Sequence, residues 1–165
     1  MSSSSSGVEP RDVHALHPLP ALLALLHAGW IWWLSSAPRS IGGSGRFWNF
    51  VSDSTHLVLF GLLAVLLLET LRRGGGWTRN ALLAVLALTV GWGVVDELHQ
   101  GSVPHRHADP ADVCTDFLGA VGAIALWWGV RGPGRIATAV GRASIVAGVA
   151  LAFNAWRAFA PEASP

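Results

Sequence analysis

The stretch GWGVVDELHQGSVPHRHADPADVCTDFLGAVG, residues Gly91–Gly122, decides the fold of this chain. An apolar run ends in acidic residues, a short loop rich in histidine follows, and further acidic residues lead into a second apolar run. Ionisable groups at membrane depth are costly, so they normally face the protein interior or a water-filled cavity. The stretch therefore predicts two membrane helices joined by a short loop, with a polar site beside that loop.

The composition of the whole chain is typical of a membrane protein. Of its 165 residues, 52% are hydrophobic and 13% are charged, whereas an average soluble domain has about 25% charged residues. The net charge of +1 and the lack of a basic patch interleaved with aromatic residues argue against a nucleic-acid partner. The single Cys114 excludes an intramolecular disulfide and a metal site built from several cysteines.

Four apolar stretches are long enough to cross a bilayer, since its hydrocarbon core needs about 20 residues of helix. We predict these spans at residues 19–37, 50–71, 80–98 and 110–130. Residues 1–18 are rich in Ser and Pro, and we expect them to form a disordered tail. They do not resemble a signal peptide, because a charged n-region and an A-x-A-like cleavage site are missing.

The carboxyl-terminal part is less clear. Residues 131–160 form an additional apolar helix, and residues 161–165 a short tail. The uninterrupted apolar part, residues 143–156, is about 14 residues long, which is short for a span and suits an interfacial or re-entrant helix. The predicted fold is therefore an all-α membrane bundle, with four spanning helices in residues 19–130 and a last helix that either spans or lies at the interface.

Arginines near the span ends predict the orientation, because cytoplasmic loops carry an excess of positive charge. The side of the amino terminus would carry Arg11, Arg72, Arg73, Arg79, Arg131 and Arg135, and the other side Arg39, Arg46 and Arg106. We therefore expect a cell-membrane protein with a cytoplasmic amino terminus. The start of the second span, the end of the third and the start of the fourth then meet at the extracytoplasmic face.

Nine polar residues would gather at that face. As catalytic candidates we take Asp53, His56, Asp96, Glu97, Gln100, Asp112 and Asp116, and as contacts for a phosphate or carboxylate Arg106 and Asp109. Asp53 and His56 are three residues apart and can pair on one helix face. A carboxylate beside an imidazole suits general acid–base catalysis. Alternatively, Asp53 only caps its helix.

The acids before the loop need a partner. Asp96 and Gln100 are four residues apart and share a helix face, while Glu97 points about 100° away. Acids at the carboxyl end of a helix oppose its dipole. Arg106, the arginine of the following loop, either pairs with one of these acids or binds an anionic group of a ligand.

Residues 109–112, Asp-Pro-Ala-Asp, are typical of a helix start, with Asp109 as the N-cap. Asp116 lies one turn deeper, where capping does not explain it. The same helix stripe continues with Gly119, Gly122 and Ala123, small residues that allow a neighbouring helix to approach closely.

The loop also contains His99, His105 and His107, but their spacing matches no HExxH-type pattern. Histidines in a polar turn are commonly just exposed. We therefore expect neither a metal nor a cofactor.

Together, Asp53, His56 and Phe60 in one span, the DE-x-x-Q of residues 96–100, Arg106, the D-x-x-D of residues 109–112 and Gly119 resemble the VanZ-like family of small bacterial membrane proteins. The resemblance covers about residues 48–130. It implies a multi-helix integral membrane protein and a link to low-level teicoplanin resistance, the property of the member that names the family. Asp116 stands where the family more often has Asn, and Phe60 where it has Tyr.

The sequence leaves three functions open and does not decide whether the protein is an enzyme. The first is an envelope-facing enzyme that acts on the headgroup of a lipid or lipid-linked precursor, with Arg106 holding a phosphate. The second is a non-catalytic binding or scaffold protein that changes the response of the cell surface to glycopeptides. The third is a structural role, in which the polar residues only connect helices. No protein partner is indicated.

Overall fold

The computed structural model describes residues 16–37, 45–72, 76–131 and 136–160. These residues form five helices, which are α1 (Pro18–Ser35), α2 (Arg46–Thr70), α3 (Arg79–Gln100), α4 (Pro110–Arg131) and α5 (Ile136–Phe159). All five are long and apolar enough to cross a membrane. The predicted all-α, multi-pass membrane bundle is confirmed. Of the tail expected over residues 1–18, residues 1–15 lie outside the described residues. The tail expected at residues 161–165 lies outside them as well.

Helix α5 is longer than the sequence suggested for the carboxyl-terminal part. It has 24 residues, which gives a length of about 36 Å at 1.5 Å per residue. It is therefore a fifth candidate span. The apolar run of residues 143–156 underestimated its length at both ends: the helix begins seven residues earlier, at Ile136, with Arg142 inside it, and it continues for three residues beyond Trp156. In that last part, Arg157 pairs with acids at the starts of α2 and α4.

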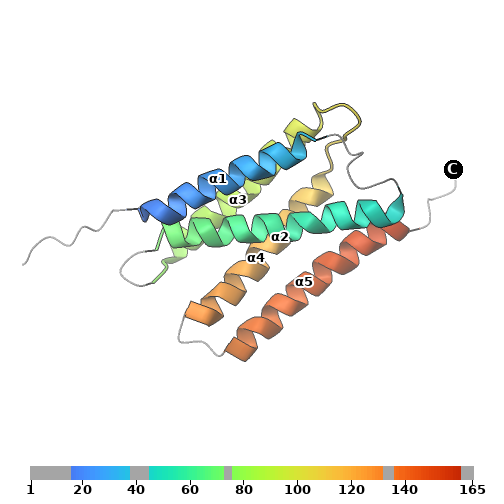
Figure 1. Ribbon diagram of the computed structural model, residues 1–165. Coiled ribbons are helices and arrows are strands. Elements are labelled where there is room, and N and C mark those ends of the chain that lie inside the picture. The colour runs from blue at the N-terminus through green and yellow to red at the C-terminus, as the bar shows by residue number, and fades with distance from the viewer. Residues whose placement is uncertain (1–15, 38–44, 73–75, 132–135, 161–165) are drawn as a thin grey trace, which may run out of the picture.

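Consecutive helices run in alternating directions, and α2 contacts all four of the others (Figure 1). Helix α1 packs against α2 and α3, and α4 crosses α2 between α3 and α5 and contacts all three. The end of α1, the start of α2, the end of α3, the start of α4 and the end of α5 consequently share one end of the bundle. We call it the polar end.

Small residues bring α2 and α4 into close contact, as the predicted stripe requires. A Cβ atom on Gly119 would collide with the backbone carbonyl of Leu57, and one on Gly61 would lie 3.1 Å from the carbonyl oxygen of Gly119 and 3.2 Å from Cβ of Ala123. Gly122 faces α5 instead, where its Cβ would lie 3.4 Å from Val146. Because packing drives helix association in lipid, this crossing fixes how α2 and α4 present their polar residues.

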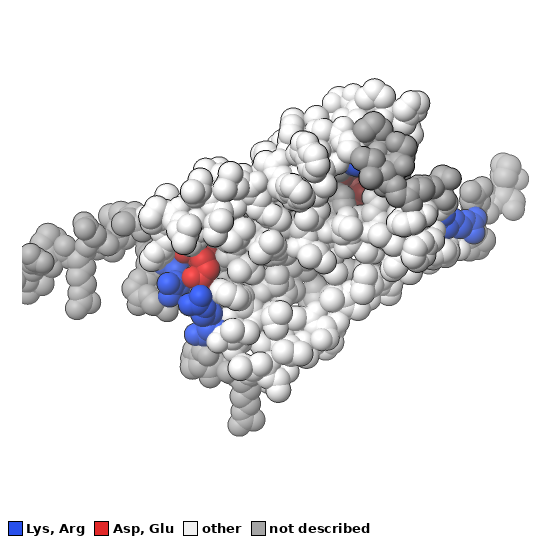
Figure 2. All heavy atoms as spheres, viewed as in Figure 1, with Lys and Arg blue, Asp and Glu red and all other residues white. Residues whose placement is uncertain are grey.

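The surface between the two ends is apolar. Large side chains such as Leu25, Leu98 and Ile145 expose 72%, 69% and 69% of their surface, which suits a bundle surrounded by lipid chains. On the face drawn in Figure 2, charged side chains are confined to the two ends of the bundle, and a small red and blue area is recessed in the surface near the polar end.

Candidate functional site

The structure brings all nine predicted residues together at the polar end and adds a tenth, Arg157 of α5. We call these ten residues the polar cluster. Most of them are deeply buried: Asp53, His56, Asp96, Glu97, Gln100, Asp112 and Asp116 each expose 9% of their surface or less. At 1.5 Å per residue, His56 lies about 15 Å along α2 from its start, and Asp96 about 6 Å from the end of α3. The cluster thus extends from the loop well into the bundle.

His56 is held by an acid on another helix. Its Nδ1 atom donates a hydrogen bond to Oδ1 of Asp116, at 2.9 Å. The imidazole also stacks on Phe60, one turn further along α2, with ring centroids 5.7 Å apart. Phe60 is fully buried, so the ring orientation is fixed from two sides.

Asp53 and His56, which the sequence places where they can pair, both lie in the cluster and contact residues of other helices. His56 pairs with Asp116, and Asp53 lies with Oδ2 3.7 Å from the guanidinium of Arg157. In both pairs, the partner of the α2 residue comes from another helix. The close crossing of α2 and α4 at Gly119 brings Asp116 within hydrogen-bond distance of the imidazole.

Gln100 connects the acids of α3 to the loop. Its Nε2 atom donates to Asp96 Oδ2 at 2.8 Å and to Glu97 Oε1 at 3.2 Å. Its Oε1 atom accepts a hydrogen bond from Arg106 Nη1 at 2.9 Å. Arg106 is therefore linked to both acids through the amide, and the shared face of Asp96 and Gln100 is as predicted.

Arg106 also closes the end of α1. Its Nε and Nη2 atoms donate to the carbonyl oxygens of Ala37 and Leu34, at 2.9 and 3.4 Å. Basic side chains commonly satisfy the last carbonyl groups of a helix in this way. The residue thus fixes the position of its loop relative to α1.

The start of α4 is capped as the sequence predicts. Oδ1 of Asp109 accepts a hydrogen bond from the backbone N–H of Ala111 at 2.9 Å. The N–H of Asp109 in turn donates to Glu97 Oε2 at 2.5 Å. Glu97 is therefore the residue that joins the end of α3 to the start of α4.

Arg157 is the member of the cluster that the sequence reasoning missed. Its guanidinium forms ion pairs with Asp109 and with Asp112, the latter at 2.8 Å. Three residues earlier on α5, the fully buried Asn154 accepts a hydrogen bond from Thr115 at 3.0 Å. A signal was present: Asn154 and Arg157 are polar residues of an apolar run, spaced to share one helix face.

The cluster consequently has two halves. Arg157 with Asp53, Asp109 and Asp112 ties α5 to α2 and α4, which is a structural arrangement. His56, Asp96, Gln100 and Arg106 instead line a groove of about 810 Å³. The walls of this groove are largely apolar and come from α1 and α2, including Ile31, Leu34, Val58 and Leu59.

Acids outnumber arginines in the cluster. It contains the carboxyl groups of Asp53, Asp96, Glu97, Asp109, Asp112 and Asp116, and the guanidinium groups of Arg106 and Arg157. Among the described residues, six carboxyl groups thus face two arginines and one imidazole. The site is suited to a ligand or ion with positive charge, or to an anion that a cation accompanies.

Two histidines outside the cluster, His27 and His99, have contacts that explain them structurally. His99 stacks on Trp32, with ring centroids 3.8 Å apart, and its Nε2 lies 2.9 Å from Oγ of Ser36. His27 contacts the backbone oxygen of Leu59 at 2.9 Å, which joins α1 to α2. Likewise, Glu69 at the opposite end of the bundle pairs with Arg72, three residues further along the chain, at 3.2 Å.

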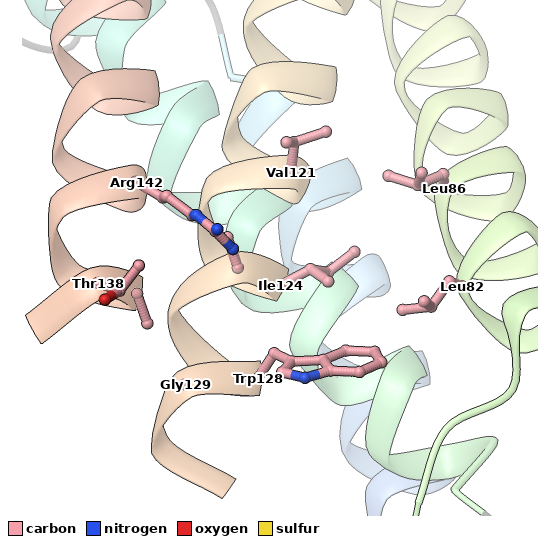
Figure 3. Close-up of a pocket in the computed structure, with 10 residues that line it drawn as sticks. Leu82, Leu86, Val121, Ile124, Trp128, Gly129, Thr138 and Arg142 are labelled. Carbon is pink, nitrogen blue, oxygen red and sulfur yellow. The ribbon is translucent and has the colours of Figure 1, made fainter. Parts of the chain in front are cut away.

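A second cavity, of about 560 Å³, lies between α3, α4 and α5, away from the polar end (Figure 3). Leu82, Leu86, Ile124 and Trp128 give it an apolar lining, and Arg142 is the charged residue among those that line it. It contains no group of titratable residues comparable to the polar cluster within the part of the chain that the structure describes.

The fold and the cluster define a class, that of small multi-pass α-helical membrane proteins with ionisable residues buried at one end of the bundle. The chain belongs to the VanZ/LLP1 family, whose family model matches residues 2–131. This confirms the resemblance seen over residues 48–130. The match contains all nine predicted site residues, whereas Asn154 and Arg157 follow it. Comparisons with curated proteins and with solved structures found no significant match.

Proposed function

We propose that this protein binds a membrane lipid or a lipid-linked precursor of the cell envelope in the groove and acts on its headgroup. The observation that carries the proposal is the two-part lining of the groove, with apolar walls and a polar end formed by His56, Asp96, Gln100 and Arg106. An amphipathic molecule has the same two parts. The volume of about 810 Å³ is also within the range of about 300–1,000 Å³ that is usual for ligand sites.

His56 is the residue best placed for proton transfer. Asp116 fixes the proton on Nδ1, so Nε2 presents its lone pair and can accept or return a proton. Asp96 and Glu97 lie beside it, since one ligand atom from each of the three residues falls within 4.8 Å of the others. In this proposal Arg106 contacts a phosphate of the headgroup, because it is the basic residue among the described residues of the groove lining.

Comparative lipid mass spectrometry tests this proposal. Cells would express the wild type, Glu97→Gln, His56→Ala or the control Glu69→Gln, which removes a carboxylate at the opposite end of the bundle. At matched membrane levels, a lipid or lipid-linked species should change with the wild type and with Glu69→Gln, and should not change with the two cluster variants. Identical lipid profiles in all four strains would refute catalysis.

A second candidate is a non-catalytic binding protein. It is favoured by Arg106, whose Nε, Nη1 and Nη2 atoms all donate to protein groups, which leaves the guanidinium a structural role. Under this alternative, a lipid-linked precursor raises the unfolding temperature of the purified protein but no product forms. Formation of product by the wild type alone would exclude it.

We further propose that the polar end faces the outside of the cell and that the protein lowers glycopeptide susceptibility, teicoplanin being the drug to test. The distribution of arginines supports this orientation. Cys114 is the single cysteine, so a Cys114→Ser background permits labelling at one chosen position. A membrane-impermeant maleimide should label Ser102→Cys but not Gly76→Cys in intact cells; the reverse pattern would overturn the orientation.

A further inference from the structure

We propose that His56, Asp96 and Glu97 bind one divalent transition-metal cation, with Asp116 orienting the imidazole. One nitrogen or oxygen atom from each of the three residues lies within 4.8 Å of the other two. Ligand atoms bound to zinc at about 2.0–2.2 Å lie about 3–4 Å from one another. The three side chains therefore need only small rotations to surround a single ion.

The unsatisfied oxygen of Asp96 is an independent observation that points to the same ligand. Asp96 exposes 1% of its surface, and its Oδ2 atom accepts from Gln100. Its Oδ1 atom is buried and has no hydrogen-bond partner among the described residues. A buried carboxylate oxygen without a partner costs free energy. Asp96 also lines the groove with His56, so a cation placed between them would satisfy this oxygen.

His56 has the surroundings of a metal-binding histidine. Such a histidine usually donates its other ring N–H to a carboxylate, which fixes the tautomer and the ring orientation. Here Nδ1 donates to Oδ1 of Asp116 at 2.9 Å, and Asp116 is completely buried. Nε2 is consequently the ring atom that the ion would bind.

The carboxylate of Asp116 is itself held against α3. A Cβ atom on Gly93 would collide with Asp116 Oδ2, so the acid occupies the space that a side chain at Gly93 would take. Asp116 thus lies between the imidazole of α2 and the backbone of α3. Its place beside His56 follows from the packing of three helices.

The charge of the cluster favours a cation. Within the described ranges, the cluster has two arginines for six carboxyl groups, and Arg157 contacts Asp53, Asp109 and Asp112 on the side of the cluster that faces α5. Asp96, Glu97 and Asp116 form the other half. A divalent ion there would neutralise most of the remaining negative charge, in a place where uncompensated charge is costly.

The ligand types narrow the choice of metal. One imidazole nitrogen with two carboxylates suits Zn²⁺, Mn²⁺ or Fe²⁺, whereas Ca²⁺ and Mg²⁺ prefer oxygen ligands alone. The remaining coordination positions would face the groove, as in catalytic sites, which keep a position open.

This metal site differs from the expectation drawn from the sequence, which considered only the histidines of the loop. It stands apart from the proposed function, because metal binding can be measured without a substrate.

Calorimetric titration of the full chain in detergent, with any affinity tag removed and metal stripped by a chelator, tests the proposal. With Zn²⁺ and with Mn²⁺, the wild type should bind one equivalent. His56→Ala, Asp96→Asn and Glu97→Gln should each weaken binding at least 100-fold, and Asp116→Asn by about 10–100-fold. The matched control Glu69→Gln, and His105→Ala with His107→Ala, should bind like the wild type. Absence of binding by the folded wild type, or equal affinity in the cluster variants, would overturn the proposal.

X-ray absorption of the zinc-loaded wild type identifies the ligands of the ion even where a cluster variant does not fold. The spectrum should show nitrogen and oxygen ligands with one imidazole. A sulfur ligand would place the ion at Cys114, and two or more imidazoles would place it at the histidines of the loop. Either spectrum would contradict the site at His56, Asp96 and Glu97.

Discussion

Replacing Arg157 by Ala should destabilise the bundle strongly, because three acids lose their shared partner. The side chain of Arg157 is 15% exposed, and those of Asp112 and Asp53 are 5% and 7% exposed. Removing one partner of a buried ion pair costs about 3–5 kcal/mol, since the other charge remains buried. Asp109, whose side chain is 43% exposed, can turn to water and adds little.

We expect the free energy of unfolding to fall by about 3 kcal/mol, the lower end of that range, because the contact with Asp53 is long, at 3.7 Å. Unfolding in mixed micelles, followed by circular dichroism, measures the change. Arg142→Ala is the matched control on the same helix, at a position away from the cluster. It should change the free energy by about 0.5 kcal/mol or less, as an exposed residue does.

A double-mutant cycle shows whether the loss comes from the ion pair. Asp112→Asn removes the partner charge, so the double variant should lose less free energy than the sum of the single variants, by about 1–3 kcal/mol. A free energy of unfolding for Arg157→Ala within about 0.5 kcal/mol of the wild type would refute the reasoning. Strict additivity of the two substitutions would show that the carboxylate of Asp112 does not depend on Arg157.

Two glycines give further predictions. Gly119→Ala should lower the free energy of unfolding by about 1–3 kcal/mol, because its Cβ would collide with the backbone of α2. Its control is Gly148→Ala, which has open space around it and should have little effect in the same unfolding assay. Gly93→Ala should displace the carboxylate of Asp116 and weaken zinc binding by about 10–100-fold, as measured by calorimetry. Gly91→Ala, whose Cβ would have no neighbour within 4 Å, is its control, and equal zinc affinity in the two variants would contradict the positioning role of Asp116.

The division of the polar cluster predicts two kinds of mutational effect. Ion pairs to Arg157 occupy the acids that face α5, while the residues around His56 face the groove. Substitutions in the first half should act on stability, and those in the second half on ligand or metal binding. The structural hypothesis and the functional hypotheses therefore apply to different residues of one cluster.

The sequence by itself determined the class of fold and the end of the bundle at which the polar residues gather. Apolar runs of sufficient length predict spans because a bilayer demands them, and the observed helices begin and end within a few residues of the predicted limits. Alternating helix direction then places His56, Asp96 and Asp112 at one end, whatever the rotation of each helix. The N-cap at Asp109 could also be predicted from the sequence, since capping is a local interaction.

Only the tertiary structure decided which of these residues pair. The pairing of His56 with Asp116 depends on the crossing of α2 and α4, which the contact between Gly119 and the backbone of α2 sets. The role of Arg157 depends on α5 packing beside α4. Periodicity defines the faces of a single helix, but the rotation and distance between helices come from packing, which is why the partners across helices emerged only in the folded bundle.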